Sequence, residues 1–170
     1  MKKLVLPALL ALTLAACSST GPENTGASTQ NGGAGVATVT AGSASGSGIA
    51  ALTDPNNILS KRSVFFDFDS FVIKQEARAL VEAHARFLVQ NPQMKMLVQG
   101  NTDERGSREY NLALGQKRAD VVKQALMLLG AKEAQIESVS LGEEKPRCED
   151  RTETCYAENR RGDMLYSGEF

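Results

Sequence analysis

Residues 100–122 read GNTDERGSREYNLALGQKRADVV, and this stretch decides the fold. In its second half and just beyond it, apolar positions recur at the spacing of an amphipathic helix. Along that stripe lie Leu114, Arg118, Val121, Val122, Ala125 and Leu129. Ser107 is a favourable N-cap and Gly130 a favourable terminator, so the pattern predicts a helix over 108–129. Arg118 stands out, because a guanidinium on a buried stripe is costly unless a negative group meets it.

The flanking segments alternate between strand-like and helix-like patterns. They predict strands over 63–68, 94–99, 137–142 and 162–166, and a further helix over 74–90. In the first strand, Val64, Phe66 and Phe68 share one face. The order βαβαββ predicts an α+β fold, a sandwich in which two long helices pack on one face of a mixed sheet.

The sequence gives little support for catalysis or for nucleic-acid binding. His84 is the only histidine and lies on the apolar stripe of the helix over 74–90. No serine or cysteine is placed by the sequence to partner it, so we interpret it as a core residue with satisfied hydrogen bonds. The net charge is −1, without the strong basic bias of a nucleic-acid-binding protein. We therefore expect neither an enzyme nor a cofactor or metal site.

The N-terminus resembles a bacterial lipoprotein signal. Lys2 and Lys3 precede an apolar run over 4–14 that is too short to span a bilayer. The letters LAAC at 14–17 match a lipobox, which predicts a signal peptide over 1–16 and lipidation of Cys17. Ser18, in place of an aspartate, is typical of lipoproteins sorted to the outer membrane. The alternative is an ordinary secretory signal that happens to be followed by a cysteine.

Composition separates a linker from the folded domain. Residues 21–48 hold eight Gly, five Ala, four Ser and four Thr with a single charge, Glu23. Such a segment buries too little apolar surface to offset its ordering entropy. We expect a flexible linker over 17–57, which ends near the turn sequence DPNN at 54–57, and a compact domain over 58–170.

Two further cysteines, Cys148 and Cys155, close a short loop. In a periplasmic protein the pair favours a disulfide, since that compartment permits disulfides. The alternative is a metal site, but two cysteines without a nearby histidine make a poor ligand set.

A candidate pocket centres on Asp103 and Arg118. Gly100 and Gly106 bracket a loop in which the backbone can approach a ligand. Asn111 and Leu114 lie before Arg118 on the same side of the predicted helix. One carboxylate and one guanidinium in a pocket suit a zwitterion, whereas the structural alternative is a salt bridge between Asp103 and Arg118.

Four motifs resemble the OmpA-like C-terminal domain family: FFDFDSFVI, the long stretch quoted above, GEEKP and NRR, in that order. The resemblance implies non-covalent binding of the diaminopimelate residue of peptidoglycan stem peptides. Its ammonium would contact Asp103 and its carboxylate Arg118. The other implied contacts fall on Asn111, Leu114, Thr102, Phe68 and Asp69.

The resemblance also implies a place in the cell envelope. We expect a lipoprotein on the periplasmic face of the outer membrane that tethers this membrane to the wall. The family further implies a role in the Tol system, in envelope integrity and in cell division, with a periplasmic β-propeller protein as partner. The alternatives are a structural or protein-binding lipoprotein without a wall ligand, and a wall-cleaving enzyme.

Two features of the sequence depart from the family pattern, and two arginines near its end are not assigned to the ligand. Val72 stands where the family often has an aspartate, and the loop between Cys148 and Cys155 is unusual for it. Arg160 and Arg161 begin the last predicted strand, and we interpret them as mostly structural.

Overall fold

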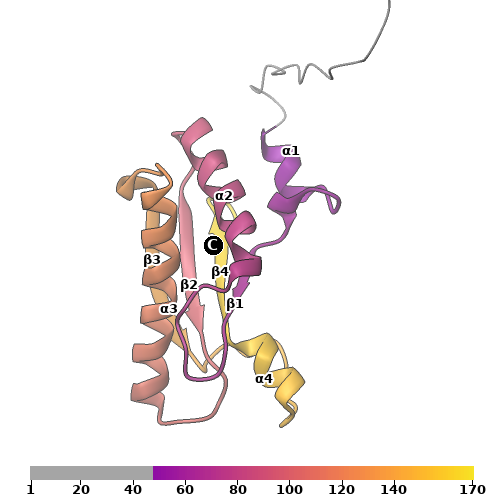
Figure 1. Ribbon diagram of the computed structural model, residues 1–170, viewed down its shortest axis with the longest axis vertical. Helices are drawn as coiled ribbons and strands as arrows, with labels where there is room; N and C mark the ends of the chain where they lie inside the picture. The colour runs from indigo at the N-terminus through magenta and orange to yellow at the C-terminus, as the bar shows by residue number, and fades with distance from the viewer. Residues whose placement is uncertain (1–47) are drawn as a thin grey trace, which may run out of the picture. The chain divides into compact units, whose positions relative to one another are not determined.

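The computed structural model describes residues 48–170 (Figure 1). The predicted signal peptide over 1–16, the lipidated Cys17 and the linker up to residue 47 lie outside the described residues. Within the described part, no helix is both long and apolar enough to cross a membrane.

A four-stranded mixed sheet forms the back of the domain. Its strands are β1 (Ser63–Phe65), β2 (Met96–Asn101), β3 (Ile136–Gly142) and β4 (Arg161–Tyr166), in the spatial order β1-β4-β2-β3. β4 is antiparallel to both β1 and β2, whereas β2 and β3 run parallel. The mixed sheet predicted from the sequence is confirmed.

Two long helices, α2 (Arg78–Gln90) and α3 (Arg108–Leu128), cover one face of this sheet. Three 3₁₀ turns connect the elements, at Ile58–Ser60, Gln75–Ala77 and Glu133–Gln135. The core between helices and sheet is aliphatic with a few aromatic rings. It includes Val64, Phe66, Val81, Leu88, Met96, Val98, Val122, Leu126, Ile136, Met164 and Tyr166. Burial of this apolar surface is the main force that holds the layers together.

Helix α3 begins as predicted, because the Ser107 hydroxyl accepts a hydrogen bond from the Tyr110 backbone N–H at 3.2 Å. Its end differs from the prediction. Leu129 lies beyond the last turn and is 47% exposed, while Leu126 supplies the final buried contact. Gly130 has a φ of 103°, which suits its predicted role as terminator.

The first strand is shorter than the predicted 63–68. It ends at Phe65, and Phe68 is 57% exposed instead of sharing the buried face with Val64 and Phe66. Phe68 therefore lies in the loop after β1, next to Asp69, whose φ of 52° is in the left-handed region.

The domain boundary predicted at residue 58 lies too late. Helix α1 (Gly48–Thr53) falls inside the predicted linker, and Leu52 belongs to the hydrophobic core. The Leu52 carbonyl also accepts a hydrogen bond from Arg62 Nη2 at 3.0 Å. The short apolar run IAAL at 49–52 supplies Leu52 to the core, although the residues before it are rich in Gly and Ser.

The β2 and α3 backbones touch at two glycines. A Cβ on Gly100 would lie 1.8 Å from the Gly115 carbonyl oxygen, so no larger residue fits. We expected Gly100 to let a ligand approach the backbone, but the structure uses it to bring the helix against the strand. The contact fixes the first half of α3 next to the end of β2.

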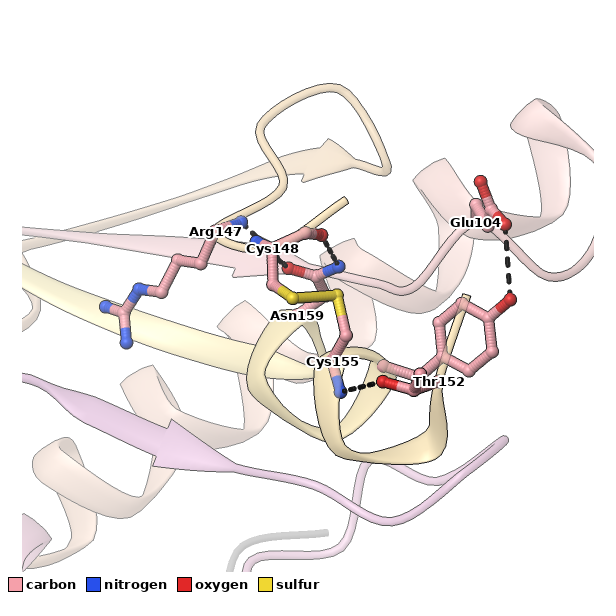
Figure 2. Close-up of a disulfide and its surroundings, with 7 residues drawn as sticks. Glu104, Arg147, Cys148, Thr152, Cys155 and Asn159 are labelled. Atoms are coloured by element: carbon pink, nitrogen blue, oxygen red, sulfur yellow. Dashed lines mark hydrogen bonds between the residues drawn. A yellow bond between two sulfur atoms is a disulfide. The ribbon is translucent and has the colours of Figure 1, made fainter. Parts of the chain in front are cut away.

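A short helix, α4 (Glu153–Asn159), lies between β3 and β4 along the chain. The sequence pattern did not predict this helix. Cys148 and Cys155 form the predicted disulfide at its side, with a Cα–Cα distance of 5.3 Å (Figure 2). No metal-binding cluster accompanies these cysteines in the described part of the chain.

His84 is a buried core residue, as predicted. Its Nε2 donates to the Lys61 carbonyl at 2.8 Å, since that oxygen can only accept. Nδ1 therefore accepts from the Tyr166 hydroxyl, also at 2.8 Å. Burial lowers the pKa of His84 from 6.5 to about 4, so the ring is neutral at physiological pH.

Candidate ligand pocket

A pocket of about 200 Å³ opens between the loop after β1, the loop after β2 and the first turns of α3. It contains all the residues that the sequence suggested for ligand contact. They are Phe68, Asp69, Thr102, Asp103, Asn111, Leu114 and Arg118. Arg105, Gly106, Tyr110 and Arg160 complete the lining. The exposed Val72 is not among these residues, so its departure from the family pattern lies outside the pocket lining.

Arg118 is fully buried, with 0% of its surface exposed. Its guanidinium donates to three backbone carbonyls, from Nε to Ser70 at 2.8 Å, from Nη1 to Asn101 at 2.9 Å and from Nη2 to Asp67 at 3.1 Å. Burial lowers the pKa of Arg118 to about 10, so it remains charged at neutral pH. The carbonyls hold the side chain in one orientation at the inner wall of the pocket.

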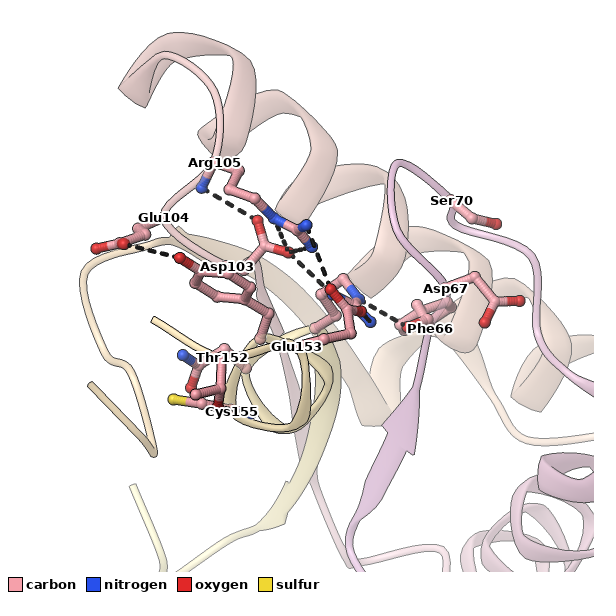
Figure 3. A network of polar contacts seen from close by, with 12 residues as sticks. Phe66, Asp67, Ser70, Asp103, Glu104, Arg105, Thr152, Glu153 and Cys155 are labelled. Carbon is pink, nitrogen blue, oxygen red and sulfur yellow. Dashed lines mark hydrogen bonds and ion pairs between the residues drawn. The ribbon is translucent and has the colours of Figure 1, made fainter. Parts of the chain in front are cut away.

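The alternative of a salt bridge between Asp103 and Arg118 is wrong. Among residues 48–170, Asp103 pairs with Arg105 and Arg160 instead (Figure 3). Its Oδ2 accepts from Arg105 Nη2 at 2.8 Å and from Arg160 Nη1 at 3.1 Å, and its Oδ1 accepts from the Arg105 backbone N–H at 3.1 Å. Sequence spacing placed the two predicted residues in one pocket but did not reveal which partners each one has.

The charge of Asp103 is secured by these partners. Burial opposes its ionisation, but the hydrogen bonds from Arg105 and Arg160 outweigh that effect and lower the pKa of its carboxyl. The side chain of Asp103 is therefore an anion at neutral pH and accepts hydrogen bonds only.

Arg105, which the sequence did not single out, and Arg160 also line the pocket. The Arg105 guanidinium lies between two aromatic rings, 4.1 Å from the centroid of Phe68 and 4.4 Å from that of Tyr156. Arg160, which we expected to be mostly structural, contacts Asp103 at 3.1 Å and the Phe66 carbonyl at 3.2 Å. Arg105 lies in the quoted motif two residues after Asp103, which is the signal that would have suggested it.

The remaining polar groups differ in how well they are satisfied. The Tyr110 hydroxyl donates to the Asp69 carboxylate, and the Asn111 amide donates to Glu143. Thr102 is 3% exposed, and its hydroxyl has no hydrogen-bond partner among the described residues. A buried hydroxyl without a partner is unfavourable, so this atom is a natural contact for a bound polar group.

The pocket therefore combines a fixed cation and a fixed anion in one small cavity, which Thr102 with its unpartnered hydroxyl also lines. The profile of the OmpA family matches residues 65–160, which include this pocket. The chain belongs to the OmpA family.

Relatives and solved structures of the OmpA family agree with this assignment. A peptidoglycan-associated lipoprotein of Pasteurella multocida is 47% identical over 104 residues, which cover 61% of this chain and 69% of that protein. A protein of the same name from Pseudomonas putida is 39% identical over 163 residues and covers 92% of this chain and 93% of its own. The crystal structure of the peptidoglycan-associated lipoprotein from Burkholderia pseudomallei is 55% identical, with a TM-score of 0.68 over 69% of this chain and 99% of that one.

Proposed function

We propose that this protein is an outer-membrane lipoprotein whose OmpA-family domain binds peptidoglycan without covalent chemistry and so ties the outer membrane to the cell wall. The family assignment and the names of its relatives support peptidoglycan as the ligand. The chemistry of the pocket supports a zwitterionic group of the stem peptide, such as the free end of diaminopimelate.

The observation that carries the proposal is the state of Arg118. It is a buried cation with three backbone carbonyls as partners and no carboxylate bonded to it in residues 48–170. An arginine side chain has more N–H donors than these bonds use. A ligand carboxylate in the pocket would take the remaining donors and neutralise the charge, which is a strong interaction at a buried site.

Asp103 supplies the complementary group. Within the described chain its Oδ1 accepts only the backbone N–H of Arg105, so this oxygen has acceptor capacity left for an ammonium. An amino-acid end carries an ammonium and a carboxylate at a fixed separation, which an anion and a cation that line the same pocket can recognise together.

The rest of the proposal concerns anchoring and partners. Lipidation of Cys17 would hold the protein in the outer membrane, with the domain on the periplasmic face. Many copies that each bind the wall weakly would hold by avidity. The protein would act in the Tol system, with a periplasmic β-propeller protein as its partner. It would bind the wall without cleaving it.

Co-sedimentation of the full chain, in mild detergent, with purified diaminopimelate-type sacculi tests the proposal. We expect the wild type to pellet with the wall and Asp103→Asn to stay in solution. Asp120→Asn is the matched control, because Asp120 lies on α3 outside the pocket and bonds to Gln116 and Ser138. Circular dichroism checks that each variant folds, and a sample without sacculi corrects for pelleting of micelles.

The outcomes separate the proposal from its alternatives. If the wild type stays in solution, wall binding is wrong and a protein-binding lipoprotein becomes the better description. If Asp103→Asn pellets like the wild type, the wall is bound elsewhere. Release of soluble muropeptides during the incubation would indicate a wall-cleaving enzyme.

A further inference from the structure

Helix α4 is too short to be stable by itself and is fixed by its surroundings. A helix of seven residues has only two turns, far below the length at which isolated helices form. The Cys148–Cys155 disulfide ties it covalently to the preceding loop. At its other end, Asn159 Nδ2 donates to the Cys148 carbonyl at 2.7 Å, and Asn159 Oδ1 accepts from the Arg147 backbone N–H at 2.8 Å (Figure 2).

Two side chains of α4 contact the arginines that hold Asp103. Glu153 accepts from Arg160 Nη2 at 2.6 Å and lies 3.3 Å from Arg105 Nη1 (Figure 3). The ring of Tyr156 lies under the Arg105 guanidinium at 4.4 Å. Each guanidinium is thus shared between α4 on one side and Asp103 on the other.

We propose that the Cys148–Cys155 disulfide is a positioning element for the pocket: it holds α4 so that Glu153 and Tyr156 keep Arg105 and Arg160 at the distance at which Asp103 can still receive a ligand ammonium. The inference rests on the proposed function and adds to it a role for residues that do not touch the ligand. It concerns a loop that the family resemblance did not explain.

The direction of the effect follows from the shared contacts. Without the disulfide, α4 frays, and the two guanidinium groups lose Glu153 and the Tyr156 ring. Asp103 is then their remaining carboxylate partner, so both close on it more tightly. The two guanidinium groups then compete with the ligand ammonium for the Asp103 oxygens. Ligand binding weakens, although the residues that line the pocket are unchanged.

The first test compares the wild type with the double variant Cys148→Ser/Cys155→Ser, each as the full chain in mild detergent. Titration calorimetry with a soluble diaminopimelate-containing disaccharide tetrapeptide gives the affinity. We expect the variant to bind about fivefold more weakly, at the lower end of coupling between sites. Circular dichroism at the titration temperature verifies that the variant remains folded.

A second ligand separates positioning from general damage to the fold. The same muropeptide with its free diaminopimelate amine acetylated has no ammonium for Asp103. If the disulfide acts through Asp103, the wild type and the cysteine variant bind this ligand equally well. If the variant loses the same factor for both ligands, the disulfide supports the domain generally and the proposal is wrong.

A point variant tests the same pathway with the disulfide intact. Glu153→Gln removes the carboxylate that competes with Asp103 for Arg105 and Arg160. Because the Glu153 side chain is 64% exposed, we expect only about a two- to threefold loss of affinity for the muropeptide. Glu149→Gln is the matched control, since it makes the same chemical change at an exposed position of the loop that precedes α4. It should bind like the wild type.

The two proposals fail in different ways. If the oxidised wild type does not bind the muropeptide with the free amine, the proposed function fails and this inference with it. If the wild type binds and the folded cysteine variant binds equally well, the proposed function stands and only the role of the disulfide is refuted.

Discussion

Two buried polar clusters lie at different places in the domain, and only one of them has the properties of a binding site. Around His84, each ring nitrogen has one partner, the Lys61 carbonyl or the Tyr166 hydroxyl, and the ring is neutral. Around Asp103 and Arg118 the groups are charged, and the Thr102 hydroxyl has no partner in the described chain. Burial and polarity alone therefore do not distinguish the two clusters, whereas the second one combines buried charge with hydrogen-bonding capacity left over after folding.

The largest difference between the two clusters is expected in ligand affinity, when Arg118 is substituted. Arg118→Lys keeps the charge, but an ammonium cannot reach three carbonyls and a ligand carboxylate at once. We expect the affinity for the muropeptide to fall by roughly 100-fold or more, about 3 kcal/mol, in a titration experiment.

Arg161→Lys is the control for that substitution. Arg161 is also buried, at 5% exposure, but bonds to Asp163 and lies outside the pocket lining. Both variants should lose stability in urea unfolding, whereas only Arg118→Lys should lose affinity. Equal affinity losses would show that the two arginines do not differ in function.

The His84 cluster should show itself through the pH dependence of stability. Its pKa is lowered from 6.5 in the unfolded chain to about 4 in the fold, so between these values the unfolded state binds more protons. The contribution of His84 is complete above about pH 7 and is lost as the pH falls from 6.5 toward 4. At ~1.4 kcal/mol per pKa unit, the loss approaches about 3 kcal/mol.

Urea unfolding across this pH range measures that loss, with His84→Gln as the reference that cannot titrate. Arg62 and Glu169 are the charged groups that act on the ring, and they are unchanged in the variant. The difference in unfolding free energy between wild type and variant should shrink as the pH falls. A difference that stays constant with pH would mean that His84 is not held neutral.

A smaller effect, with opposite signs for stability and binding, is expected at Thr102. Thr102→Val replaces the buried hydroxyl by a methyl group of the same shape and removes an unsatisfied polar atom. We expect a gain of up to ~1 kcal/mol in unfolding free energy and a severalfold loss of muropeptide affinity. Loss of stability in thermal unfolding would show that the hydroxyl has a partner within the fold.

The smallest expected effect is the pH dependence of binding itself. Because the arginines lower the pKa of Asp103, its carboxyl stays ionised from neutral pH down to the ordinary range of an aspartate. The contribution of Asp103 is therefore present above that range and lost only as the pH falls through its lowered pKa. Titrations between about pH 5 and 8 should give a nearly constant affinity, and a decline near pH 6 would point to another group.

The sequence was informative where local signals decide the structure. Ser107 as an N-cap and the apolar stripe from Leu114 were enough to place α3, because both act within one helix. Motif resemblance also selected residues that the structure brings together in one pocket. Helix α4 was not foreseeable from periodicity, since it has seven residues and depends on a disulfide and on Asn159.

The partners within the site were harder to predict than its members. Arg160 reaches Asp103 from a position 57 residues away in the sequence, and the carbonyls around Arg118 come from the loop after β1 and from the end of β2. Such contacts depend on how the loop after β1 and the end of β2 meet α3. No periodic or compositional pattern encodes that arrangement.

The contact between Gly100 and Gly115 has a consequence for how the domain can change over evolutionary time. Asp103 follows the first glycine by three positions and Arg118 follows the second by three, so the separation of the two charged groups is set by touching backbones. We expect the interior to tolerate wide replacement among apolar residues, while a single methyl group added at Gly100 changes the distance between the two charges.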